Sequence, residues 1–189
     1  MKVEIGPFPQ YDEETQKYDI KKRKIDINID RWDTWSMDHT LALIIHPMLI
    51  HLKENSHSYG MVDDKDVPKR LRIPKGWVGS DENGYMDDNG SDRWQWVLDE
   101  MIWTFEQIAS DDAENHFYTG HSDIIWTDID VNGNEITAEE AEDIGNSYVR
   151  MDRGPEDTFK FDSKGFAKYS KRIKRGTKLF GKYFQALWD

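Results

Sequence analysis

The chain contains no cysteine and only six prolines among its 189 residues. It can therefore form no disulfide, no thiol nucleophile and no cysteine-ligated zinc site. No stretch approaches the roughly 20 apolar residues that span a membrane, and the start has no apolar run of signal-peptide length. These absences predict a soluble, intracellular protein without a membrane partner. The length predicts a single domain over residues 1–189.

Motifs of familiar catalytic chemistry are also missing. The sequence has no GxSxG, no Walker loop, no dinucleotide-binding GxGxxG and no HExxH zinc motif. No carboxylate pair stands out among the 37 Asp and Glu residues as an acid–base couple. The sequence therefore favours a protein that is not an enzyme and that uses no cofactor and no metal. A metal-dependent hydrolase stays open as a third hypothesis.

Charge is plentiful but uneven. Residues 54–150 carry 23 acidic and 7 basic side chains, whereas residues 151–189 carry 5 acidic and 10 basic ones. A second basic run, Lys21-Lys22-Arg23-Lys24, leads into a predicted strand. The two signs can neutralise each other within the fold and keep the protein soluble. The distribution also fits an acidic face that mimics nucleic acid, or a basic pocket for an anionic ligand.

Alternating apolar residues predict the strands. Val3 and Ile5 indicate a short first strand, and Ile25, Ile27 and Ile29 form one face of a half-buried second strand. A further short strand is predicted near residues 70–73. Residues 124–131 and 134–137 read as a hairpin around the Asn132-Gly133 turn, followed by a short helix over residues 138–145.

Helical spacing of apolar residues predicts the rest of the fold. The stripe of a first helix is Leu41, Ile44, Ile45, Met48, Leu49 and Leu52, and Pro47 should kink or break it. The stripe of a second helix, starting near Asp92, is Trp94, Val97, Leu98, Met101, Ile102, Phe105 and Ile108. Residues 163–188 have aromatic residues on one face and Lys and Arg on the other. We predict an α+β fold, a small antiparallel sheet covered by two or three long amphipathic helices.

The sequence from Asp128 to Glu139 resembles a calcium-binding loop. Acidic residues or Asn occupy its first, third and fifth positions, with Gly133 at the sixth and Glu139 at the twelfth. The eighth position, which is normally apolar, is Glu135, and the preceding segment reads as a strand. We therefore expect a plain hairpin rather than a calcium site. The acidic, Asn- and Gly-rich stretch 81–92 is expected to be a long loop.

Asp-Arg-Trp occurs twice, at residues 30–32 and 92–94, and each copy lies at the start of a predicted helix. A second tryptophan follows each copy, Trp35 and Trp96. If the two turns meet, their rings could stack a base and their guanidinium groups could hold phosphates. The alternative is that both turns only pack in the core. The candidate ligand-binding residues are Arg31, Trp32, Trp35, His39, Arg93, Trp96, Arg172 and Arg175.

Four stretches together resemble a family of small proteins encoded by tailed bacteriophages. They are residues 30–49 (DRWDTWSMDHTLALIIHPML), residues 61–68, residues 92–102 (DRWQWVLDEMI) and the ending LFGKYFQALWD. The resemblance implies a phage origin and the cytoplasm of an infected bacterium, and it supplies no catalytic residues. We expect a counter-defence protein that sequesters a small nucleotide-derived ligand such as a host immune signal. The alternative is an acidic protein that mimics DNA or binds and inhibits a host enzyme; either could be a homo-oligomer.

Overall fold

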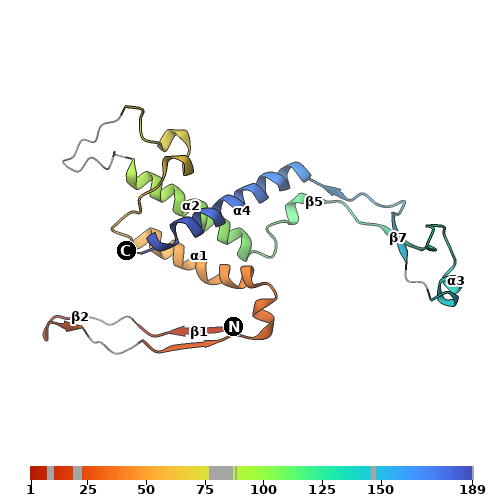
Figure 1. Cartoon of the computed structure of the whole chain (residues 1–189), viewed down its shortest axis with the longest axis horizontal. Helices are drawn as coiled ribbons and strands as arrows, with labels where there is room; N and C mark the ends of the chain where they lie inside the picture. Colours follow the sequence, from red (N-terminus) through yellow and green to blue (C-terminus); the bar gives the residue numbers. More distant parts are fainter. Residues whose placement is uncertain (8–10, 19–22, 77–86, 88, 146–147, 189) are drawn as a thin grey trace. The chain divides into compact units, whose positions relative to one another are not determined.

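The computed structural model describes residues 1–7, 11–18, 23–76, 87, 89–145 and 148–188 (Figure 1). They form two compact units. The first comprises Met1–Ser110 with Gly176–Asp189, and the second comprises Asp111–Arg175. The α+β fold class with small antiparallel sheets is confirmed. The prediction of a single domain stays a prediction. Most of the predicted loop 81–92 and half of the basic run, Lys21 and Lys22, lie outside the described residues.

The first unit begins with an antiparallel ribbon. Strand β1 (Lys2–Ile5) pairs with β4 (Ile25–Asn28), and the short strands β2 (Tyr11–Asp12) and β3 (Lys17–Tyr18) pair with each other. Val3 lies opposite Ile27, and Ile5 lies opposite Ile25, so their side chains share one face. That face is exposed: Ile25 retains 63% of its accessible surface. The prediction that this strand is half-buried is therefore wrong.

Helix α1 (Met37–Asn55) follows a 3-10 helix η1 (Arg31–Thr34). It continues through Pro47, so the helix is not broken there, and the predicted alternative, a kink, stays a prediction. Only Ala42 and Leu49 are fully buried. The predicted stripe is therefore a core face only in part, because Leu41 and Met48 are exposed.

Helix α2 (Gly90–Ala109) is the centre of the hydrophobic core, and its predicted stripe is largely confirmed. Trp94, Val97, Leu98 and Met101 are at most 2% exposed. α2 packs against α1 and against the end of α4 (Ser163–Tyr183), which carries Leu179 and Tyr183 into the same cluster. A Cβ at Gly176 would lie 1.9 Å from Thr104 Oγ1, so glycine permits the close approach of α4 to α2.

The described part of the segment between α1 and α2, residues 56–76, closes the core without a strand. It contains two 3-10 helices, η2 (Asp64–Asp66) and η3 (Lys69–Leu71), so the strand predicted near residues 70–73 is wrong. Val67 and Leu71 are buried against the helices. Gly60 packs against the Trp94 ring, and a Cβ added at Gly60 would come within 2.9 Å of a ring carbon. The packing of Val67 and Leu71 in the core, rather than strand pairing, therefore anchors this segment.

The second unit is built around small strand pairs and the first part of α4. Strand β5 (Tyr118–Thr119) pairs with β8 (Lys160–Phe161), and β6 (Ile124–Asp128) pairs with β7 (Val149–Arg153). The predicted hairpin is corrected in extent: a short turn around Asn132-Gly133 closes through the Ile129–Glu135 bridge and the bond from the Ile136 N–H to the Asp128 carbonyl, whereas β6 itself pairs with β7. The short helix is confirmed as α3 (Ala138–Asp143), and the 3-10 helix η4 (Asn115–Phe117) precedes β5.

Candidate interaction surfaces

The first Asp-Arg-Trp turn lies on the surface. Asp30 accepts a hydrogen bond from the Trp32 N–H at 2.9 Å, and Asp33 accepts one from the Asp30 N–H at 2.7 Å. These bonds form the capping box of η1 and occupy both acids. The rings of Trp32 and Trp35 are 61% and 82% exposed. The turn therefore presents two indoles to solvent.

The geometry of this turn limits what it can bind. The Trp32 and Trp35 ring centroids are 6.0 Å apart with planes tilted by 52°. A flat base held between two rings needs about 7 Å, two contact distances, so the pair cannot sandwich one as it stands. The Arg31 guanidinium lies 4.4 Å from the Trp32 ring centroid. A ligand can stack only on an outer face, with Arg31 as the neighbouring cation.

Arg93 and Trp94 of the second Asp-Arg-Trp are buried instead. Arg93 is 4% exposed. Its guanidinium donates to both carboxylate oxygens of Asp87, at 2.5 and 3.0 Å, and to the Leu71 carbonyl at 3.2 Å. The hydrogen bond with Arg93 holds the pKa of Asp87 below its ordinary value. Trp94 is enclosed in the core and meets Tyr183 edge to face. This turn is a packing motif whose cation is already paired.

The structure does not bring the two turns together. His39 Nε2 lies 3.0 Å from the Ala109 carbonyl, which places the start of α1 against the end of α2. Lys53, near the end of α1, pairs with Asp99 in the first half of α2. The helices are therefore antiparallel, and their entrances lie at opposite ends of a pair about 30 Å long. Arg31 and Arg93 do not form the predicted two-guanidinium pocket.

The remaining predicted residues have separate locations. His39 links α1 to α2, as described above, and Trp96 is partly buried against the core cluster. Arg172 and Arg175 lie on the part of α4 that belongs to the second unit. Of the eight predicted ligand-binding residues, Arg31, Trp32 and Trp35 form one exposed cluster.

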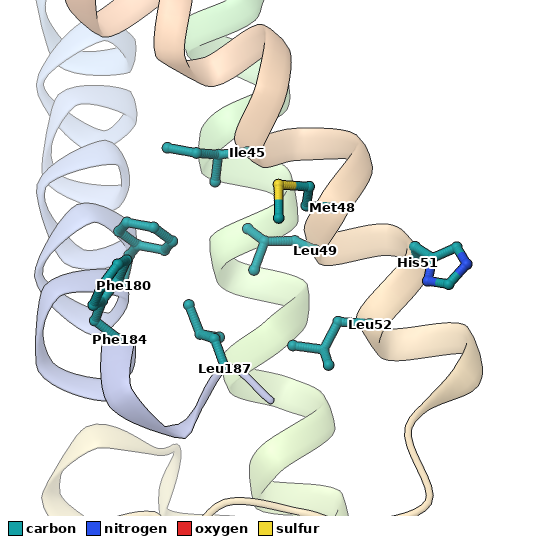
Figure 2. Close-up of a pocket in the computed structure, with 8 residues that line it drawn as sticks. All are labelled: Ile45, Met48, Leu49, His51, Leu52, Phe180, Phe184 and Leu187. Atoms are coloured by element: carbon teal, nitrogen blue, oxygen red, sulfur yellow. The ribbon is translucent and has the colours of Figure 1, made fainter. Parts of the chain in front are cut away.

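An apolar groove, missed by the sequence prediction, lies between α1 and the end of α4 (Figure 2). Its volume is about 660 Å³. Figure 2 shows side chains from both helices projecting toward the space between the ribbons. The lining residues are Ile45, Met48, Leu49, His51, Leu52, Phe180, Phe184 and Leu187. None of them carries a carboxylate, ammonium or guanidinium group.

The groove exists because α1 has more apolar surface than the core uses. Between Asp38 and Lys53 the helix has no Asp, Glu, Lys or Arg. Met48 is 66% exposed and Leu43 is 55% exposed. A helix that is apolar around its circumference is usually buried on all sides. No described helix is long and apolar enough to cross a membrane. The charge-free run was the sequence signal that could have indicated an interface.

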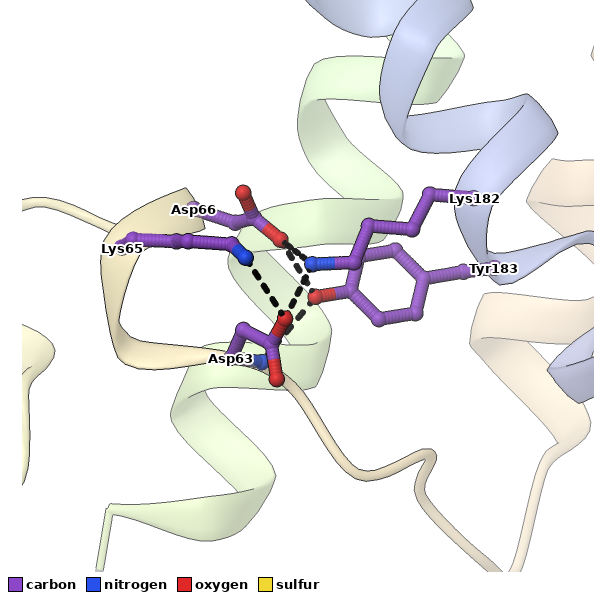
Figure 3. A network of polar contacts seen from close by, with 5 residues as sticks. All are labelled: Asp63, Lys65, Asp66, Lys182 and Tyr183. Carbon is purple, nitrogen blue, oxygen red and sulfur yellow. Dashed lines mark hydrogen bonds and ion pairs between the residues drawn. The ribbon is translucent and has the colours of Figure 1, made fainter.

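A polar network fixes the end of α4 that lines the groove (Figure 3). Lys182 pairs with both Asp63 and Asp66. The Tyr183 hydroxyl donates to Asp66 at 2.7 Å and accepts from the Asp63 N–H at 3.0 Å. Lys65 lies 3.5 Å from Asp63. Residues 61–68 and the ending, two of the four stretches named in the sequence analysis, thus meet in this network. We call these five residues, Asp63, Lys65, Asp66, Lys182 and Tyr183, the clamp.

Electrostatics within this network favour its charged form. Burial alone would raise the pKa of Asp66, but hydrogen bonds from Lys182 and Tyr183 outweigh it and the net shift is downward. Hydrogen bonding and the charge of Lys182 lower the pKa of Asp63. Burial, reinforced by the bond to Asp66, raises the pKa of Tyr183. The clamp is therefore ionised and intact at neutral pH.

The calcium-like loop has its own internal hydrogen bonds. One Asp130 oxygen accepts from the N–H groups of Asn132 and Asn134, both at 2.8 Å, and the other accepts from the Asn134 amide at 2.9 Å. Gly133 adopts φ +85°, which favours glycine. In the described part of the chain, no group of three or more His, Asp or Glu residues is arranged to hold a metal. That this loop does not bind calcium stays a prediction.

Comparison with known proteins found no family model, no curated protein and no solved structure that matches the chain. The phage resemblance therefore stays a prediction.

Proposed function

We propose that the protein is a non-catalytic phage accessory factor whose α1–α4 groove binds an amphipathic helix of a host protein. The observation that carries this proposal is the groove itself, with seven apolar lining residues and no charged one. Helix-in-groove binding uses apolar anchors at helical spacing and needs no catalytic residues. The partner helix presents such anchors to Met48, Phe184 and Leu187.

The size of the surface suits this partner. The part of α1 that lines the groove, from Ile45 to Leu52, extends over about 12 Å, enough to contact about two turns of a partner helix. A contact of this length belongs to the smaller class of interfaces, typical of transient partners. A nucleotide is a poor occupant, because its phosphates would enter an uncharged groove and lose their hydration.

Charge favours a different protein over a second copy of this chain. Each copy carries a net charge of −12, so two copies repel one another at the low ionic strengths where screening is weak. A host protein with basic residues flanking its apolar helix is instead attracted. A homodimer formed through the groove is the competing outcome, and light scattering of the purified protein distinguishes the two.

Charge substitution in the groove tests the proposal. A displayed library of host-protein fragments is selected against the native protein, and enriched peptides are synthesised and their affinities measured. Met48→Glu and Phe184→Glu should each weaken binding of a groove-binding helix by about 100-fold, because a carboxylate would be buried unpaired. Ile27→Glu, on the exposed ribbon face, is the matched control and should leave affinity unchanged. Peptides that bind all three variants equally would refute the groove as the binding site.

Nucleotide capture is retained as a second candidate because Arg31 lies over the Trp32 ring. Here Trp35 would stack one base on its outer face and Arg31 would contact phosphate. Thermal-shift screening of cyclic and ADP-ribose-derived nucleotides near 1 mM tests it, with Arg31→Ala and Trp35→Ala as variants. A stabilising nucleotide whose effect both variants abolish would favour this candidate, and no shift from any nucleotide would eliminate it.

A further inference from the structure

The part of α4 in the second unit carries a row of basic side chains on one face. The whole helix has eight Lys and Arg residues and no Asp or Glu. Lys164, Lys168, Lys171 and Arg175 are spaced by four, three and four residues, which places them on one face over about 16 Å. All four are exposed. Among the described residues, the three lysines make no ion pair within 4 Å.

The opposite face of the same helix holds this row in position. Phe166 and Tyr169 pack on the buried Phe117, with ring centroids 5.6 and 5.3 Å from it. The helix is therefore anchored through its aromatic side and cannot turn that side outward without losing the core of the unit. Only the basic face is available to a ligand.

A stacked aromatic pair precedes the basic row. Tyr118 of β5 lies opposite Phe161 of β8, with ring centroids 5.1 Å apart and planes at 19°. The two rings are 43% and 42% exposed. Phe161 is three residues before Lys164, so the rings stand at the end of the helix where the row begins. Asp162, between them, accepts a hydrogen bond from the Gly165 N–H at 2.9 Å as part of the helix start.

We propose that this surface of the second unit binds single-stranded nucleic acid. Proteins that bind single strands without sequence preference combine a row of cations along the backbone with aromatic rings that stack bases. The three lysines would contact successive phosphates, and Tyr118 with Phe161 would stack one or two bases. The proposal is independent of the groove and adds a second ligand to the proposed host-protein partner.

A membrane is a less suitable ligand. Helices that lie on membranes insert their apolar face into the lipid boundary, and the apolar face of α4 is occupied by Phe117. An unfolded acidic protein offers charge but no bases for the exposed rings. The exposed stacked rings therefore favour nucleic acid over the other anionic ligands, a membrane or an acidic protein.

Fluorescence anisotropy of a labelled 20-nucleotide oligothymidine tests the proposal on the intact chain. Three phosphate contacts give a log–log salt slope of about −2, so affinity should fall about 20-fold between 50 and 200 mM salt. A duplex of the same length should bind more weakly, because its bases are not free to stack. Equal or tighter binding of the duplex would overturn the single-strand assignment, and binding to anionic vesicles but not to oligonucleotides would overturn the proposal altogether.

Three variants separate this site from general electrostatics. Lys164→Glu, Lys168→Glu and Lys171→Glu together should weaken binding at least tenfold. The matched triple Lys2→Glu, Lys17→Glu and Lys69→Glu changes net charge equally and should retain nearly native affinity. Tyr118→Leu keeps an apolar side chain but removes the ring, and should weaken binding about fivefold with an unchanged salt slope. Equal effects of the two triples, in proteins with unchanged circular dichroism, would refute the site.

Discussion

Helices α1 and α2 have nearly the same length and the same Asp-Arg-Trp entrance, yet their environments are opposite. α2 contributes Arg93 and Trp94 to the interior together with most of its stripe. α1 contributes two fully buried residues, and its entrance presents Trp32 and Trp35 to solvent. The tripeptide is the same, but its second copy lies inside α2, which begins at Gly90, whereas the Asp30–Asp33 capping box forms a separate 3-10 turn before α1.

The difference shows that an apolar stripe identifies a helix without identifying what covers it. α2 alternates its stripe with charged residues such as Asp99 and Glu106, which remain at the surface. α1 has no charged side chain between Asp38 and Lys53, so its exposed side is apolar as well. This exposed apolar face of α1 is the surface on which the proposed protein partner would bind.

The largest difference in the free energy of unfolding is expected between two single variants, Arg93→Ala and Arg31→Ala. Arg93→Ala leaves the Asp87 carboxylate buried without its partner, and should lower the free energy of unfolding by about 3–5 kcal/mol. Arg31→Ala, at the exposed turn, should change it by less than about 0.5 kcal/mol. Urea unfolding of both variants measures the difference. Equal destabilisation would show that the first turn is also structural.

Truncating one apolar residue of each helix sharpens the comparison. Leu98→Ala should cost about 2–5 kcal/mol, because Leu98 is fully buried and its loss leaves a cavity. Met48→Ala should cost less than about 0.5 kcal/mol, since most of its side chain already contacts solvent. Calorimetry of the two variants tests this. A comparable loss at Met48 would mean that the groove is closed by the protein's own residues.

The clamp that fixes the end of α4 should make stability depend on acid pH. The folded-state pKa of Asp66 lies below its ordinary value of 3.8, so its stabilising effect is present above about pH 4. It is lost as the pH falls through the folded-state pKa. Asp66→Asn should reduce stability at pH 7 by about 1–2 kcal/mol and flatten the acid dependence. Urea unfolding at pH 7, 4 and 3 gives both quantities, and an unchanged acid slope would contradict the role of Asp66.

Much of the fold followed from local sequence pattern. The stripe around Leu98 predicted α2, and the alternation of Ile25 and Ile27 predicted β4. Local pattern could not show whether an apolar face is covered, because cover depends on elements distant in the sequence. Helical spacing predicts a core position for Ile45 as it does for Leu98, but Ile45 packs against the core cluster only partly buried, beside the groove. The burial of Arg93 depends on Asp87 and Leu71, which no helical spacing reveals.

The smallest effect is expected at the exposed indoles. Trp35→Ala should change the free energy of unfolding by less than about 0.5 kcal/mol, because 82% of Trp35 is exposed. Its removal should also leave the affinity of a groove-binding helix unchanged. Differential scanning fluorimetry and peptide titration of the variant measure the two quantities. A large fall in peptide affinity would move the interface from the groove to the first turn.

The claim that the second face of α1 is an interface is tested most directly by mapping a bound helix. A selected host-derived peptide is titrated into isotope-labelled protein, and backbone and methyl chemical shifts are followed. We predict that the largest shifts fall on Ile45, Met48, Leu52 and Leu187, with little change at Trp32 and Trp35. Shifts concentrated at the two indoles, with the groove residues unmoved, would contradict the assignment.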